Sequence, residues 1–253
     1  MRMPRPVVLG VAVLAGSALA GCGSGDTAAV LAPGAARGTG AVTKVQAVAY
    51  ARAVNLRAAD LPRMNASSPE HEGKAPTRIE LALARCDGEQ NPTQRVLNRV
   101  SPTFISPTED EGESEHEEIH SSVEVLPAAA IAARHNRAQI SPRGLDCIRH
   151  FIPTAFAKSD TRRLRYGPVI LQHLPNPLPD VPGSFAVRIA TSVLGVPSQI
   201  AATPPHVYID ILGFLSGASE INLTATGFPE PVGEEAEQHL LTLLYNRTQT
   251  NRL

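Results

Sequence analysis

Four apolar or alternating runs in the last third of the chain constrain the fold most strongly. They span residues 169–174, 185–193, 207–215 and 221–226. Turn-forming residues, including Pro175, Pro204 and Gly217, separate them. Short alternating runs are typical of strands, and connections this short favour antiparallel neighbours. The last third is therefore predicted to be an antiparallel β-meander, with a tight hairpin turn at Ser216-Gly217.

Helical periodicity predicts helices before and after this meander. The first helix begins with a capping box of Thr43 and Gln46, and an Ala-rich helix covers 127–138. A further helix begins at Ser141-Pro142, and its Pro153 is expected to kink or end it. A final helix presents an apolar face made of Ala236, Leu240, Leu243 and Leu244.

Three further strands are expected before the meander. Ile79, Leu81 and Leu83 alternate with other residues, which predicts a strand that ends near Cys86. A second strand is expected near Phe104, and a third over 119–125. Apolar helix faces need a sheet to cover, so the predicted fold class is α+β. We expect one sandwich domain over residues 43–253, in which helices cover an antiparallel sheet that ends in the meander and final helix.

The start of the chain is typical of a secretory signal peptide. Residues 1–6 carry Arg2 and Arg5, and residues 7–20 form an apolar run. As a helix this run would span about 21 Å, short of the roughly 30 Å hydrocarbon core of a bilayer. A positive start before a short apolar run predicts a signal peptide over residues 1–21. The alternative is a short buried helix.

The sequence Leu19-Ala20-Gly21-Cys22 resembles the lipobox of bacterial lipoproteins. The resemblance implies cleavage before Cys22 and attachment of acyl chains, such as palmitate, to its thiol and new amino terminus. Several acyl chains on one residue would anchor the protein firmly to a membrane. The lipidated Cys and a flexible tether would then occupy residues 22–42, with the domain on the extracytoplasmic face of the cell membrane. The alternative is an ordinary signal peptide followed by a chance cysteine.

Two cysteines remain after Cys22 is assigned to lipid. In an exported protein an even remainder predicts a disulfide, here between Cys86 and Cys147. The bridge would join the strand expected at 79–83 to the helix that begins at Pro142. The alternative is a pair of buried free thiols.

One match to a catalytic motif occurs, at His116-Glu117-Glu118-Ile119-His120. In zinc proteases an HExxH sequence lies on a helix, where its two His bind one zinc ion. Here the following residues alternate as a strand, in which His116 and His120 would be about 13 Å apart, too far to share a metal. We interpret the match as accidental, with His116 and His120 kept as the candidate ligands of a metalloenzyme.

An acidic run covers residues 109–118. It holds seven acidic residues in ten, which predicts a solvated loop. Its carboxylates are also the ligand type that calcium prefers, so loose binding of a cation is the alternative.

Other features give no support to catalysis or to nucleic-acid binding. The net charge is −1, aromatic residues make up 4% of the chain, and no phosphate-binding glycine loop occurs. His206 and Asp210 would share one strand face about 13 Å apart, too far for a catalytic pair. We expect no cofactor and no nucleic-acid partner.

The order of elements over residues 43–250, with a Cys on a middle helix, resembles two groups of exported domains. One is the disulfide-linked sensor domain of mycobacterial Ser/Thr kinases, and the other is the small lipoproteins with a PsbP-like fold. The sequence thus favours a membrane-anchored envelope lipoprotein that binds or senses a protein, a lipid or a cell-wall component without catalysis. The alternatives are an exported hydrolase or metalloenzyme, and a structural spacer.

Overall fold

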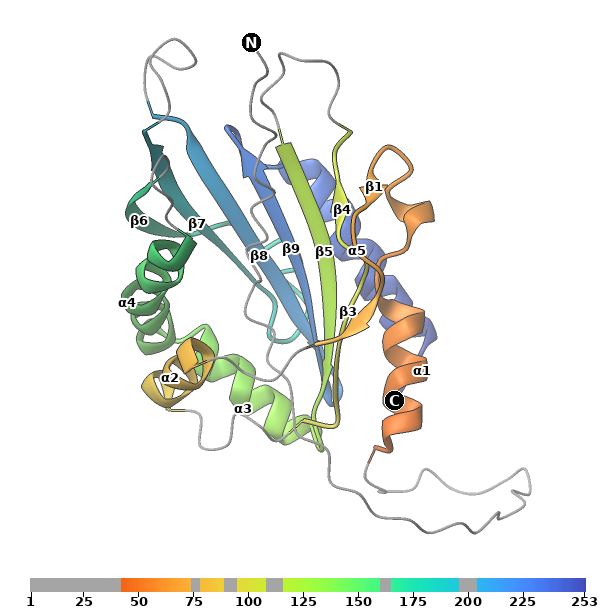
Figure 1. Cartoon of the computed structure of the whole chain (residues 1–253). Coiled ribbons are helices and arrows are strands. Elements are labelled where there is room, and N and C mark those ends of the chain that lie inside the picture. Colours follow the sequence, from red (N-terminus) through yellow and green to blue (C-terminus); the bar gives the residue numbers. More distant parts are fainter. Residues whose placement is uncertain (1–41, 74–77, 89–94, 108–115, 160–164, 196–203) are drawn as a thin grey trace, which may run out of the picture.

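An antiparallel sheet forms the centre of the molecule (Figure 1). The structure is a computed structural model that describes residues 42–73, 78–88, 95–107, 116–159, 165–195 and 204–253. The strands lie in the order β1-β4-β5-β9-β8-β7-β6, while β3 pairs with β5 beside β4, and β2 pairs with β3. Their bounds are β1 Asn65–Ala66, β2 His71–Glu72, β3 Leu97–Val100, β4 Phe104–Ile105, β5 His116–Val125, β6 Arg165–His173, β7 Phe185–Leu194, β8 His206–Ser216 and β9 Ser219–Phe228.

The predicted meander is confirmed as strands β6 to β9. Each of these strands pairs antiparallel with the next. Ser216 pairs with Ser219, which leaves Gly217 and Ala218 as the two-residue turn of the last hairpin. Gly217 has a φ of +60°, a left-handed conformation that glycine adopts without a steric penalty.

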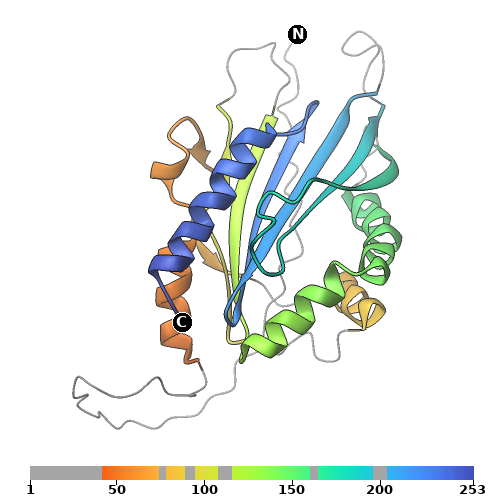
Figure 2. The same ribbon diagram turned by 180° about the vertical axis from the view of Figure 1, so that it is seen from behind.

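Helices lie on both faces of the sheet. Helices α1 (Lys44–Val54) and α5 (Glu234–Thr250) cover one face, which Figure 2 shows in front. Helices α3 (Ala129–Gln139) and α4 (Pro142–Ser159) lie on the other face, and a short 3₁₀ helix, η1 (Ala58–Asp60), follows α1. The predicted α+β class, an antiparallel sheet covered by helices, is therefore confirmed.

Each face has its own apolar core. The larger core joins the sheet to α1 and α5, and its fully buried members include Val54, Phe104, Phe214, Leu223, Leu241 and Leu244. A smaller core joins the sheet to α4, and it consists of Phe156, Ile189, Val193, Val207 and Ile209. The two cores use alternate residues of the same strands, as the two-residue period of a strand requires.

The prediction of a strand at 79–83 is wrong, because this segment lies within helix α2 (Arg78–Asp87). Its apolar residues do alternate, but they stand among Glu, Ala and Arg, which favour helix, and Ile79 is its one β-branched residue. The segment packs against α4 and not into the sheet. The helical propensity of the side chains therefore outweighed a short alternation.

Three other expectations also need correction. Helix α4 does not end at Pro153 but continues to Ser159, and Phe156 beyond the proline belongs to the smaller core. Strand β5 begins at His116, so residues 116–118 of the acidic run belong to a strand. The burial of α5 is rotated from the predicted face, with Ala236 exposed and Glu237 buried.

Several predictions concern residues outside the described part of the chain. The signal peptide, Cys22 and the tether fall within residues 1–41, and most of the acidic run falls within 108–115. None of the described helices is long and apolar enough to cross a membrane.

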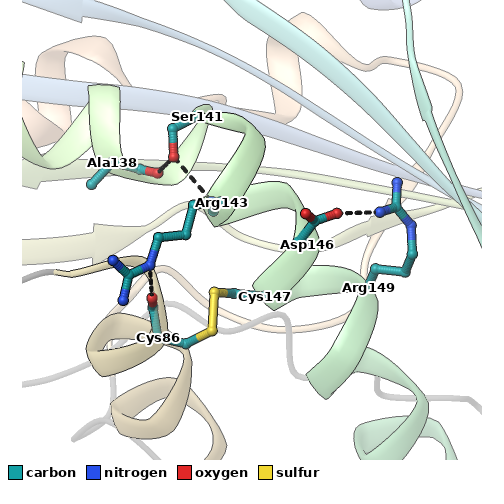
Figure 3. Close-up of a disulfide and its surroundings, with 8 residues drawn as sticks. Cys86, Ala138, Ser141, Arg143, Asp146, Cys147 and Arg149 are labelled. Carbon is teal, nitrogen blue, oxygen red and sulfur yellow. Dashed lines mark hydrogen bonds and ion pairs between the residues drawn. A yellow bond between two sulfur atoms is a disulfide. The ribbon is translucent and has the colours of Figure 1, made fainter.

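The predicted disulfide between Cys86 and Cys147 is present and joins α2 to α4 (Figure 3). The two Cα atoms are 5.9 Å apart, a normal distance for a bridged pair. Arg143 on α4 donates a hydrogen bond from Nε to the carbonyl oxygen of Cys86 at 2.6 Å. At the start of α4, Ser141 Oγ accepts from the amide of Gly144 at 3.0 Å, which is the predicted cap. The bridge therefore links two helices, and not a strand to a helix.

Replacing both Cys86 and Cys147 with Ala should lower the free energy of unfolding by about 3–4 kcal/mol, because the bridge closes a loop of roughly 60 residues in the unfolded chain. Urea unfolding of the oxidised protein measures this change. The control is Cys22→Ser, which keeps the bridge. An unchanged unfolding midpoint in the double variant would show that the bridge does not stabilise the domain.

Candidate functional site

Five polar side chains lie together on the sheet face opposite α1 and α5. We call them the polar strip: Glu118, His120 and Ser122 on β5, with Thr224 and Thr226 on β9. The residues that alternate with them, such as Ile119 and Leu223, are in the larger core, so the strip faces the other way. In the register of the two strands, Glu118 is opposite Thr226, and His120 is opposite Thr224.

The side chains of the polar strip are partly or fully buried but unpaired among the described residues. Thr224 is only 4% exposed, and the other four side chains are half-buried. Nδ1 of His120 is buried and has no hydrogen-bond partner. None of the five side chains makes a hydrogen bond or ion pair with another residue that the structure describes. Buried polar groups are normally paired, so such a set needs an explanation.

Burial disfavours the charged forms of His120 and Glu118 in the strip. Burial and, to a smaller extent, the neighbouring His71 lower the pKa of His120 to about 4. Burial also raises the pKa of the Glu118 carboxyl. Both shifts disfavour the charged form of the side chain, as expected where water is partly excluded.

Apolar side chains border the strip along β8. Ile209 is opposite Thr226 and Ile211 is opposite Thr224 in the β8–β9 register. Ile209 belongs to the smaller core, and the half-buried Ile211 packs against it. Among the described elements, no helix lies over the strip itself (Figure 1), since α4 packs against β6 and α3 reaches the far end of β9. Ile209 and Ile211 thus give the strip an apolar border on its β8 side.

The structure places the HExxH residues on strand β5 and not on a helix. His116 and His120 are four residues apart along this strand, the arrangement that the sequence predicted. Within the described residues, no group of three or more His, Cys, Asp or Glu side chains is placed to hold a metal ion. His120 instead belongs to the polar strip.

A second polar cluster lies on the opposite face, beneath α5. Arg188 on β7 donates two hydrogen bonds to Asp210 on β8, from Nε at 2.7 Å and from the terminal nitrogen at 2.6 Å. The Arg188 guanidinium also lies 5.6 Å from the ring centre of Tyr208. Glu237 on α5 is 1% exposed and lies beside Asp210, which is also 1% exposed. This cluster anchors α5 to the meander.

The surroundings of Glu237 favour its protonated form. Burial and, to a smaller extent, the nearby Asp210 carboxylate raise its pKa to about 9. The sequence analysis missed Glu237, although its spacing from Leu240, Leu241 and Leu244 places it on the same helix face. A carboxyl at a core position of an amphipathic helix was the available signal.

A third buried pair fixes α3 to the sheet. Nδ1 of His135 lies 2.8 Å from Oε1 of Glu220 on β9, and both side chains are almost fully buried. Gln139 contacts the other ring nitrogen of His135 at 3.0 Å. All the polar groups of this contact are paired with one another, so we assign it a structural role.

Comparisons with known proteins give a weak structural match. No known protein family matches the sequence, and no curated protein matches it. Among solved structures, the extracellular domain of PknH from Mycobacterium tuberculosis matches with a TM-score of 0.42 and 13% sequence identity. The alignment covers 84% of this chain and 100% of that chain. The expected resemblance is therefore supported only as a weak similarity of fold to an extracellular domain, and it says nothing about a ligand or a reaction.

Glu237→Gln should flatten the pH dependence of stability. The folded-state pKa of Glu237 lies above its ordinary value of 4.5, so folding takes up a proton and stability falls as pH rises from about 4.5 to about 9. One proton accounts for a slope of at most about 1.4 kcal/mol per pH unit. Urea unfolding at pH 5 to 9 measures the slope, which the neutral Gln removes. The exposed Glu235→Gln is the control, and an equal slope in both variants would contradict the assignment.

Proposed function

We propose that this protein is a lipid-anchored domain on the extracytoplasmic face of a membrane, and that it binds a ligand at the polar strip without catalysing a reaction. The observation that carries the binding role is the buried Nδ1 of His120, which, like the other four side chains of the strip, has no partner in the described part of the chain. A ligand with complementary polar groups would supply the missing hydrogen bonds.

The disulfide supports the extracytoplasmic location. Disulfides persist in oxidising compartments and are reduced in most bacterial cytoplasms. Cys86–Cys147 joins two helices of the same domain, so it is a structural bridge. A signal-like start and the lipobox sequence ending at Cys22 agree with the same compartment.

The proposed anchor would keep the domain near the membrane. Helix α1 begins at Lys44, about 20 residues after Cys22. A flexible chain of that length has an average end-to-end distance of roughly 25 Å. A ligand in the membrane or the nearby envelope would therefore be within reach of the domain.

Cys22→Ser should release the protein from the membrane, because the variant has no thiol to receive the diacylglyceryl group. The full chain is expressed in a bacterium that processes lipoproteins, and membrane and soluble fractions are compared by immunoblotting, together with detergent phase partitioning. Cys86→Ala with Cys147→Ala is the control for a general effect of losing cysteine, and it should stay with the membrane. Unchanged membrane association of Cys22→Ser would overturn the proposed anchor.

The binding role predicts that the purified protein carries a ligand that depends on the polar strip. Native mass spectrometry of the full chain, extracted from membranes, should show a mass above that of the denatured lipoprotein. His120→Phe combined with Thr224→Val should lose at least three quarters of this extra mass. The matched control is His239→Phe with Thr250→Val, both at exposed positions on α5.

Either of two results would overturn the binding role at the strip. One is a native mass equal to the denatured mass in the wild type, and the other is an equal loss in the control variant. Circular dichroism of all the variants establishes that each one is folded.

A further inference from the structure

The carboxylates on this face of the sheet are already paired, apart from Glu118, and the other titratable groups of the face beside the strip are the histidines His71 and His116. At the far end of β5 and β9, Glu124 pairs with Arg95 and Glu220 pairs with His135. No arginine or lysine forms part of the polar strip itself. A ligand anion would therefore lose its water without gaining a permanent counter-charge, and the ionised form of Glu118 would repel it.

The unpaired groups of the strip fit neutral hydrogen-bonding partners. The hydroxyls of Ser122, Thr224 and Thr226 can each donate and accept. The neutral imidazole of His120 donates from one nitrogen and accepts at the other. Hydroxyl and carbonyl groups of a ligand would complement these side chains, because a hydroxyl can both donate and accept a hydrogen bond and a carbonyl can accept one.

The neighbouring strand β8 is apolar where it borders the strip. Ile209 and Ile211 are the neighbours of Thr226 and Thr224 on β8, and adjacent strands are about 4.8 Å apart. A molecule that contacts both strands would have polar atoms along one edge and hydrocarbon only a few ångströms away. The half-buried Phe228 extends this apolar border at the end of β9.

Resting on the binding role proposed above, we infer that the polar strip and its border on β8 bind an uncharged amphipathic molecule. Its hydroxyl or carbonyl groups lie on His120, Ser122 and the two threonines, and its hydrocarbon part lies on Ile209 and Ile211. An acyl glycerol or a similar neutral lipid has this combination of groups.

Three probes with the same eight-carbon chain test the charge of the ligand. They are 1-monooctanoylglycerol, octanoate and octylamine, which are neutral, anionic and cationic at pH 7. Binding to the full chain is followed through the ring ¹⁵N and ¹³C shifts of His120, with the exposed His239 as an internal reference. The neutral probe should bind at least tenfold more tightly than either charged probe.

Variants of the strip test the site. Ser122→Ala with Thr226→Val keeps shape and should weaken binding of the neutral probe at least fivefold. The matched control is Thr250→Val, which should leave binding unchanged. Octanoate or octylamine binding as tightly as the neutral probe would overturn the inference, and so would equal binding by the strip variant.

The same data separate the two proposals. If none of the probes binds, but the co-purified mass is still lost in His120→Phe with Thr224→Val, the inferred ligand class is wrong and the binding role stands. If no probe binds and no mass depends on the strip, both proposals are wrong.

Discussion

The pairing of β5 with β9 is the contact on which the rest of the structure depends. It runs over the full length of both strands, from His116 opposite Phe228 to Val125 opposite Ser219. Through it the first half of the chain, with α1, β3 and β4, is joined to the C-terminal meander. Because side chains alternate along a strand, this one register also decides the content of both faces. A shift of β5 by one residue against β9 would turn His120 from the strip into the larger core.

Helices are attached to this sheet by buried polar contacts as well as by apolar packing. The ends of α5 are held by Glu237 on Asp210 and by Arg247, which donates to Asp60 at 2.7 and 2.8 Å and to the carbonyl of Asn55 at 2.8 Å. Helix α3 is held by His135 on Glu220. In the Arg247–Asp60 and His135–Glu220 contacts the buried groups have found partners, as the cost of desolvation requires, whereas Oε1 of Glu237 makes no hydrogen bond with a described residue.

The polar strip differs from these anchors in one respect. Its side chains come from β5 and β9 and are partly or fully buried, but they do not pair with described residues. A merely solvated sheet face would leave the Nδ1 atom of His120 open to water, whereas this atom is buried. That difference between a structural polar contact and an unpaired enclosed one is the physical basis for placing a ligand at the strip.

Local patterns in the sequence determined much of the architecture. The meander, the Thr43–Gln46 capping box, the Ser141 cap and the α+β class follow from contacts between residues close in the chain, so periodicity and turn residues predict them. The cysteine pairing followed from counting, given an exported chain. The helical state of 79–83, by contrast, was misjudged because its short alternation conflicted with its helix-forming residues.

Contacts between distant residues settled the remaining features. Glu237 and Asp210 are on separate elements, and nothing near either one shows that they share a buried site with Arg188. Likewise, the sequence drew attention to His120 only through the HExxH match, and it marks Thr224 only as a polar position on a strand. Whether a polar side chain meets water, a partner or an enclosed surface depends on which strand lies beside it and which helix covers it. Those are properties of packing over long sequence separations, and they do not appear in any local pattern.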